Sequence, residues 1–115
     1  METTREPHDR AVVLAVAGRL DFGHAKDFEA TLTVCIGDAA AGGLGLILDL
    51  GGVDYVSSAG LRSLMVGAKT AKAQSVGFHV CCLAQDVAEV FRISGLDQII
   101  QPLADRAAAE AHLQP

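Results

Sequence analysis

Three short apolar runs separated by two amphipathic stretches constrain the fold of this chain more strongly than any other feature. The runs occupy 11–18, 44–50 and 76–84, and their short, continuous apolar character is typical of strands buried in a sheet. In the two intervening stretches apolar residues recur every three or four positions, from Ala25 to Ile36 and from Leu61 to Ala71, which is the pattern of a helix with one buried face. Strands and helices that alternate in this way form a largely parallel sheet with right-handed connections.

Weaker patterns continue the alternation towards the C-terminus. A helical pattern from Asp86 to Ile93 is followed by Gly95, and glycine often ends a helix because it readily adopts a left-handed backbone. Residues 98–101 are predicted to form a short last strand closed by Pro102, and the alanine-rich 104–113 is predicted to be helical.

Together these elements predict an α/β fold: a single mostly parallel (mixed) sheet of four to five strands with about four helices on its faces. The 115 residues contain no linker, so one domain is expected over 11–115, and 1–10 is expected to be a flexible arm or a weak edge strand. Half of the residues are hydrophobic, which is enough for a real core. The stretch 39–45, rich in alanine and glycine, should end the first long helix, and 53–57 should be a loop.

The charge balance excludes several classes of partner. There are 14 acidic and 9 basic residues, which gives a net charge of −5, and the sequence has no cluster of lysine and arginine. Nucleic acid and anionic membrane surfaces are therefore not expected as partners. The polar N-terminus has no signal-peptide pattern, and no apolar run approaches the roughly 20 residues of a membrane helix. We expect a cytoplasmic protein without membrane insertion.

Neither the cysteines nor the histidines predict a metal site or a cofactor. Cys35, Cys81 and Cys82 form no C-x-x-C motif, and the four histidines are not spaced as ligands. The cysteines are expected to be small buried hydrophobic side chains in a reducing compartment.

The most informative segment runs from Asp49 to Arg62. A buried strand ends there, a loop follows, and Ser57 and Ser58 stand where the next helix begins. A serine in this position commonly caps a helix, because its oxygen accepts a hydrogen bond from one of the first free amides. An exposed hydroxyl at the same place also suits a phosphate, since the free amides and the helix dipole stabilise an anion.

A phosphate at this position would change the local charge. It would add roughly −1.5 to −2 charges, and Asp21, Asp49 and Asp54 are expected to lie nearby. Repulsion between these carboxylates and the phosphate would weaken the binding of a partner, which is a switch by local electrostatics.

Four sequence blocks in a fixed order carry a resemblance to a known family. They are G-R-L-D at 18–21, the apolar run ending in L-D-L at 48–50, Y-V-S-S-A-G-L-R at 55–62 and V-F-R-I-S-G-L at 90–96. Together they resemble the STAS-domain family over about 11–113, and within it the stand-alone bacterial anti-sigma factor antagonists, or anti-anti-sigma factors.

The resemblance implies a binding domain that is not an enzyme. Its implied partner is an anti-sigma factor with the fold and activity of a serine kinase ATPase, and a phosphatase reverses the modification. Alignment on Gly60 and Leu61 puts the phosphorylated serine at Ser58. Ser57 departs from the family, which has an aspartate there, and its hydroxyl makes it the alternative phosphorylated serine. The partner-binding residues that the resemblance implies are Asp21, Asp54, Tyr55, Val56, Ser57, Ser58, Ala59, Gly60, Leu61 and Arg62.

Several alternatives stay open beside this interpretation. Asp21 could simply cap the helix that follows it, and Arg62 could be a solvated charge. A hydrolase nucleophile at Ser58 would need G-x-S-x-G, and Val56 breaks that pattern. The chain could instead be a constitutive STAS subunit of a transport or stress-sensing assembly, or a STAS domain that senses a small molecule or nucleotide. The oligomeric state is open, with a monomer favoured.

Overall fold

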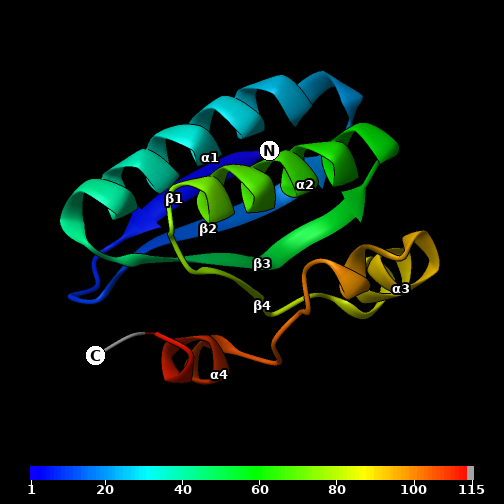
Figure 1. Ribbon diagram of the computed structural model, residues 1–115. Coiled ribbons are helices and arrows are strands. Elements are labelled where there is room, and N and C mark those ends of the chain that lie inside the picture. The colour runs from blue at the N-terminus through cyan, green and yellow to red at the C-terminus, as the bar shows by residue number, and fades with distance from the viewer. Residues whose placement is uncertain (114–115) are drawn as a thin grey trace.

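The computed structural model describes residues 1–113, which form one four-stranded sheet in the order β1-β2-β3-β4 (Figure 1). The strands are β1 (Glu2–Glu6), β2 (Ala11–Leu20), β3 (Gly45–Val56) and β4 (Phe78–Cys81). β2, β3 and β4 run parallel, and β1 pairs antiparallel with β2. The predicted fold class, one mixed and mostly parallel sheet with four α-helices, is confirmed.

Helices cover both faces of this sheet. α1 (Phe22–Gly42) and α2 (Ser58–Ala73) lie side by side on one face, and the short α4 (Arg106–Ala111) lies against the other (Figure 1). α3 (Gln85–Ser94) follows β4 and contacts β3. Within the described residues no helix is both long enough and apolar enough to cross a membrane.

Alternation along the strands divides the core into two parts. Val12, Leu14 and Val16 of β2 point towards α1 and α2, whereas Ala11 and Val13 point towards α4. Because both faces are covered, the central strands are apolar throughout, as the continuous runs in the sequence predicted. The smaller part of the core, beneath α4, is formed by Ala11, Val13, Ile47, Cys81, Ala109 and Leu113.

The predicted last strand at 98–101 is wrong. Gly95 ends α3 with a left-handed backbone (φ 78°), and Leu96–Gln98 then forms a 3₁₀ turn, η1. The amides of Ile99 and Ile100 both donate to the carbonyl of Leu96, so local bonds satisfy this backbone without a ladder. The chain pairs with β4 only after Pro102, where Leu103 forms a single parallel bridge with Cys81.

Two predicted boundaries are also wrong. The residues at 53–57 are not a loop, because β3 continues to Val56 beside the full length of β2. α1 does not end at the alanine-rich stretch but runs to Gly42, since alanine favours helix and Ala39 is buried in the core. Gly43, with φ 67°, ends it.

Candidate functional site

The candidate site lies where β2 and β3 end and two long helices begin. β2 ends at Leu20 and β3 at Val56, which are neighbours in the parallel ladder. The amide of Ser57 donates to the carbonyl of Leu20 over 3.0 Å, which continues the pairing by one residue. α1 and α2 start directly after these strand ends, so their N-terminal turns lie together at the carboxyl edge of the sheet, a common place for binding sites in α/β folds.

The side chain of Ser57 stabilises the start of α2. Ser57 is the N-cap residue, and its Oγ accepts a hydrogen bond from the amide of Gly60 at 3.1 Å. The same hydroxyl donates to the carbonyl of Leu20 at 3.4 Å. The side chain is half-buried, and its hydroxyl is engaged both as an acceptor and as a donor.

Ser58 differs from its neighbour in exposure and in bonding. It is the first residue of α2 and is exposed to solvent. Within residues 1–113 its hydroxyl has no hydrogen-bond partner, whereas the hydroxyl of Ser57 has two. A hydroxyl in this state can reach the active site of a modifying enzyme without disturbing the fold.

An open groove of about 640 Å³ runs beside Ser58 between the first turns of α1 and α2. Its lining combines small residues, a large apolar side chain and charged side chains: Phe22, Gly23, Ala25, Lys26, Glu29, Ser58, Ala59, Arg62 and Ser63. Phe22 is 84% exposed at the start of α1, a high value for an aromatic ring. The groove and the exposed ring lie together at the N-terminal end of α1.

On the strand side of the site a chain of polar contacts begins at Tyr55. The guanidinium of Arg19 lies over the Tyr55 ring at 4.1 Å, and its Nε is 3.9 Å from a carboxylate oxygen of Asp21. The other oxygen of Asp21 lies 2.7 Å from Nδ1 of His24. Asp21 occupies the N-cap position of α1, but its side chain bonds the imidazole and caps no amide.

Two opposing effects act on the pKa of Asp21. Desolvation raises it, while the hydrogen bond and charge of His24, followed by the charge of Arg19, lower it. The lowering effects prevail, so the pKa of Asp21 lies below its ordinary value and the carboxylate keeps its charge. The G-R-L-D turn thus holds an ionised carboxylate one residue after Leu20, whose carbonyl accepts from Ser57.

The structure brings most of the sequence-predicted residues together, but with different roles. Asp54, Tyr55, Ser58 and Arg62 are exposed, Ser57, Ala59 and Leu61 are half-buried, and Val56 and Gly60 are buried. Val56 and Gly60 therefore pack beneath the surface of the site and offer no contact area to a partner. Asp49 is not near Ser58: it contacts Arg106 of α4 on the opposite face of the sheet, so the expected repulsion from Asp49 is wrong.

Sequence reasoning missed Phe22 and Lys26. Phe22 is one of four phenylalanines and directly follows the G-R-L-D turn, three residues before Ala25, where the predicted helical stripe begins. Its three-residue spacing from Ala25 would continue the apolar stripe, so spacing alone carried no signal that this ring is exposed. Lys26 could be placed beside Ser58 only once the packing of α1 against α2 was known.

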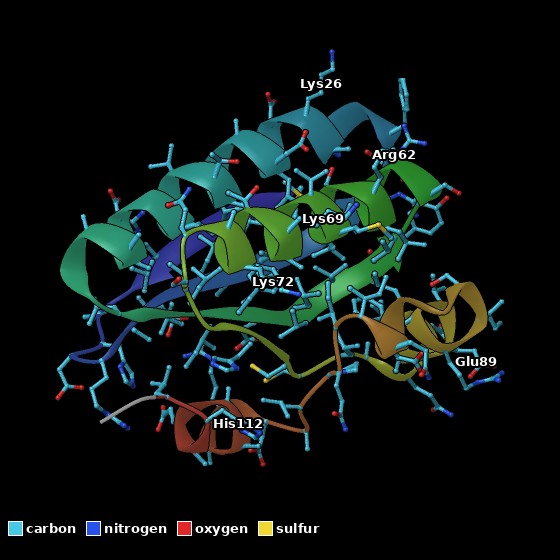
Figure 2. All side chains as sticks on the ribbon, in the orientation of Figure 1. Lys26, Arg62, Lys69, Lys72, Glu89 and His112 are labelled. Carbon is cyan, nitrogen blue, oxygen red and sulfur yellow. The ribbon has the colours of Figure 1, made fainter. Side chains whose placement is uncertain are left out.

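Four basic side chains on α1 and α2 have no ion pair within the described residues: Lys26, Arg62, Lys69 and Lys72 (Figure 2). Arg5, Arg19, Arg92 and Arg106, by contrast, all pair with carboxylates. In a chain with a net charge of −5, this helical face therefore keeps cations that are available to acidic groups of a partner.

Comparisons with known proteins found similar sequences and similar structures. A family model for the STAS domain matches residues 2–110. A Bordetella bronchiseptica protein named "Putative anti-sigma factor antagonist BtrV" is 33% identical over 111 residues, which cover 96% of this chain and 93% of that relative.

Solved structures show the same fold at lower sequence identity. An anti-sigma factor antagonist from Mycobacterium paratuberculosis superposes with a TM-score of 0.85 at 23% identity, over 99% of this chain and 94% of that one. The anti-sigma factor antagonist SpoIIAA, 18% identical over 96% of this chain, matches in its unphosphorylated form with a TM-score of 0.75 over 95% of its own length. The phosphorylated form of SpoIIAA from Bacillus matches with a TM-score of 0.66 over 98% of its length.

Proposed function

This chain belongs to the STAS domain family, and from that premise we propose that it is an anti-sigma factor antagonist regulated by phosphorylation of Ser58. In its unmodified form it binds an anti-sigma factor that is also a serine kinase, and so releases a sigma factor for transcription. The kinase then phosphorylates Ser58 and ends the interaction, and a phosphatase restores it. Such a role places the protein in the cytoplasm with the transcription machinery.

One observation carries the choice of Ser58 over Ser57. The hydroxyl of Ser58 is exposed and unbonded among the described residues, while that of Ser57 holds the first turn of α2. A kinase that took Ser57 would have to break the helix cap first, at a cost of about 1 kcal/mol. Phosphorylation of Ser58 requires no such change.

The proposed partner surface consists of the exposed residues around that hydroxyl. Phe22 and Tyr55 offer exposed aromatic contact area, and Lys26 and Arg62 offer charge. Aromatic and arginine side chains dominate the binding energy of many protein interfaces. A phosphate on Ser58 would add roughly −1.5 to −2 charges among them. It would compete with acidic partner groups for Lys26 and Arg62, and each loss of about 1.4 kcal/mol weakens binding tenfold.

The modification is tested on the protein isolated from its own host. Intact-mass spectrometry should show a form heavier by one phosphate, and peptide mapping should place the phosphate on Ser58. Ser58→Ala should remove that form, and Ser75→Ala, at the far end of α2, should keep it. A phosphate on Ser57 or elsewhere, or none under any growth condition, would refute the proposed switch.

Binding is tested with the kinase that co-purifies with the unmodified protein. Ser58→Ala should bind it as the wild type does, and Ser58→Asp should bind at least about tenfold more weakly through charge repulsion. Ser75→Asp is the matched control: it adds the same charge to another exposed serine, and aspartate tolerates the left-handed backbone found there (φ 59°). Equal binding by Ser58→Asp and wild type would indicate a constitutive subunit instead.

A further inference from the structure

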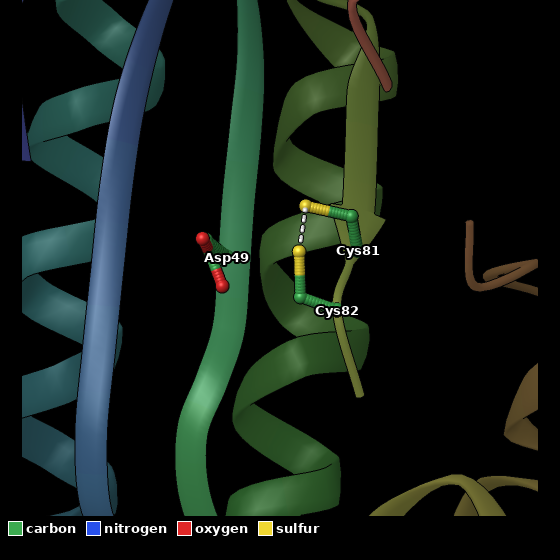
Figure 3. A group of neighbouring side chains, drawn as sticks. All are labelled: Asp49, Cys81 and Cys82. Carbon is green, nitrogen blue, oxygen red and sulfur yellow. Dashed lines mark hydrogen bonds between the residues drawn. The ribbon is translucent and has the colours of Figure 1, made fainter. Parts of the chain in front are cut away.

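A second cluster of reactive side chains lies away from Ser58, on the face of the sheet that α4 covers. Asp49 of β3 and Cys81 of β4 are direct neighbours across the parallel ladder, and Cys82 follows immediately (Figure 3). One carboxylate oxygen and the two sulfur atoms all lie within 4.8 Å of one another. The two sulfurs are 3.3 Å apart.

An unusual backbone brings the two sulfurs together. Successive side chains of a strand point to opposite faces, so adjacent cysteines in a regular strand would be separated by the sheet. β4 ends at Cys81, and Cys82 has φ 70°, in the left-handed region that residues other than glycine rarely adopt. This turn places both thiols on the side of Asp49.

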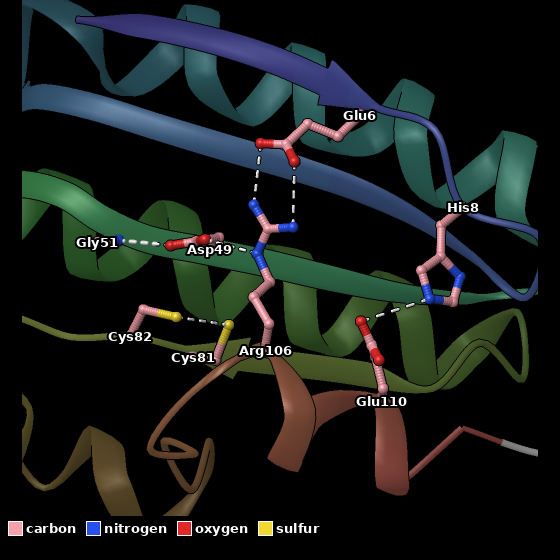
Figure 4. A network of polar contacts seen from close by, with 8 residues as sticks. All are labelled: Glu6, His8, Asp49, Gly51, Cys81, Cys82, Arg106 and Glu110. Carbon is pink, nitrogen blue, oxygen red and sulfur yellow. Dashed lines mark hydrogen bonds and ion pairs between the residues drawn. The ribbon is translucent and has the colours of Figure 1, made fainter.

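Other residues hold the Asp49 carboxylate in position. Its Oδ1 accepts from the amide of Gly51 at 2.8 Å, and its Oδ2 accepts from Nε of Arg106 at 2.6 Å (Figure 4). The terminal nitrogens of Arg106 donate to both carboxylate oxygens of Glu6, at 3.1 and 2.9 Å. Each Asp49 oxygen keeps a free lone pair, and orientation by such outer partners is typical of carboxylates that bind metals.

Access to the cluster depends on Gly51 and Cys82. Cys81 is fully buried, but Cys82 is partly exposed, so a small ion can approach from its side. A Cβ at Gly51 would lie 3.0 Å from Asp49 Oδ1 and 3.4 Å from the Cβ of Cys82. The glycine therefore leaves open the space directly beside the carboxylate and the second thiol.

We propose that Asp49, Cys81 and Cys82 form a binding site for a thiophilic divalent cation with a filled d shell, Zn²⁺ or its chemical relative Cd²⁺. Two sulfurs and one carboxylate oxygen supply three ligands, and water takes the fourth position on the side of Cys82. Zinc–sulfur bonds of about 2.3 Å in a tetrahedral site place the sulfurs about 3.8 Å apart. The present 3.3 Å separation needs only a small rotation of the exposed Cys82 side chain to reach this value.

The binding step leaves the total charge of the cluster unchanged. As the two metal–sulfur bonds form, each thiol releases its proton to water, so two positive charges enter with the metal and two leave with the protons. Asp49 stays ionised and keeps its pairing with Arg106 through the second lone pair. A buried site with a constant charge avoids the desolvation cost of an isolated ion.

The proposal is tested with the full-length protein, freed of metal and kept reduced by a reductant that contains no thiol. Titration with Cd²⁺ should saturate at one ion per chain and produce the ultraviolet absorption of cadmium–thiolate bonds. Zn²⁺ should compete for the same site. Cys81→Ser and Cys82→Ser should each abolish the absorption band. Asp49→Asn removes the charge of a direct ligand and should weaken affinity by at least the roughly 10- to 100-fold that is lost when an outer partner of a metal ligand is replaced.

Cys35→Ser is the matched control. Cys35 lies on α1 against the opposite face of the sheet, so its loss should leave stoichiometry and affinity unchanged. Cadmium NMR on the unsubstituted protein gives a readout that does not depend on variants folding, and it should report two sulfur ligands. Absence of a saturable site, a shift typical of one sulfur, or equal loss of binding in Cys35→Ser would each overturn the proposal.

Discussion

At the residue scale, two adjacent serines with the same side chain have different environments because α2 begins between them. Ser57 precedes the first helical turn, so its hydroxyl meets the amide of Gly60, whereas the hydroxyl of Ser58 points to solvent. The sequence predicted a serine cap and an exposed serine at this helix start. The residue pattern alone did not say which serine caps the helix, because that depends on one residue in the position of the helix boundary, and the choice of Ser58 as the modified serine came from the family resemblance.

The two serines should therefore differ in their effect on stability. Ser57→Ala should lower the free energy of unfolding by about 1 kcal/mol, since the Gly60 amide loses its capping acceptor. Ser58→Ala should change it by less than about 0.5 kcal/mol, as expected for an exposed position without bonds. Urea denaturation of both variants measures the difference. Equal losses would mean that Ser58 also supports the helix.

The cluster of Asp49, Cys81 and Cys82 could not be predicted from the residues alone. No local pattern joins Cys81 and Cys82 to Asp49, which is 32 positions before Cys81 in the sequence and becomes its neighbour only through the β3–β4 register. The left-handed backbone of Cys82 has no signal in the sequence either, because glycine or asparagine would be expected there.

At the element scale, the site depends on how closely the start of α2 approaches the end of β2. A Cβ at Gly60 would lie 2.5 Å from the carbonyl oxygen of Leu20 and 2.8 Å from its Cγ, so only glycine allows this approach. The three parallel strands were predictable from their continuous apolar runs, and the helices from hydrophobic periodicity, whereas the predicted strand at 98–101 is wrong. The extension of β3 to Val56 was not predictable, because Asp54 and Tyr55 break the apolar run while the backbone continues its ladder.

A pair of glycine substitutions tests this close packing. Gly60→Ala should destabilise the protein by about 1–3 kcal/mol, because the new methyl group overlaps the β2 backbone. Gly37→Ala in the middle of α1 meets nothing within 4 Å and should stabilise by up to about 1 kcal/mol through helix propensity. Thermal unfolding reports both. If Gly60→Ala were neutral, α2 would have to shift, and binding at Ser58 should then change.

His79 of β4 lies beside His112, which caps the end of α4, and this pair of histidines predicts that stability depends on pH. Desolvation, and then the charge of His112, lowers the pKa of His79 below its usual 6.5. Above pH 6.5 both folded and unfolded His79 are neutral and contribute nothing. Below it the unfolded chain binds a proton that the folded state resists, so stability should fall as the pH drops towards the folded pKa.

Replacement of His79 tests this origin of the pH dependence, and replacement of His24 is the control. His79→Gln should flatten the pH dependence of the free energy of unfolding between neutral and mildly acid conditions, measured by urea denaturation at a series of pH values. His24→Gln, in contrast, should leave that part of the profile in place, because His24 contacts Asp21 at the other end of the molecule. An unchanged profile in His79→Gln would rule out this origin.

On the scale of the whole molecule, a single arginine joins three elements. Arg106 of α4 bonds Glu6 on β1 and Asp49 on β3, and so fastens α4 across the sheet. The sequence predicted the alanine-rich helix but not this anchor, because the three residues are far apart along the chain. The predicted single sheet with helices on its faces was correct as an architecture.

Loss of this anchor should loosen α4 more than it unfolds the protein. Arg106→Ala should cost about 1–2 kcal/mol, since charge-assisted hydrogen bonds are lost at a partly exposed position. Hydrogen exchange of the α4 amides should rise more than that of β3. Arg92→Ala, which breaks only the exposed pair with Glu89, should leave the free energy of unfolding close to that of the wild type. Uniform exchange across the chain would show that α4 does not open separately.

The bond between Arg106 and Glu6 spans 100 positions of sequence and so bears on folding during synthesis. All four strands leave the ribosome before Arg106 does, and until then the apolar face formed by Ala11, Val13 and Ile47 has no cover. A nascent chain stalled before α4 therefore exposes an apolar sheet surface that chaperones can recognise. Protection of this one face from protease should therefore appear only after α4 has emerged and packed against it, while the core beneath α1 and α2 can form earlier.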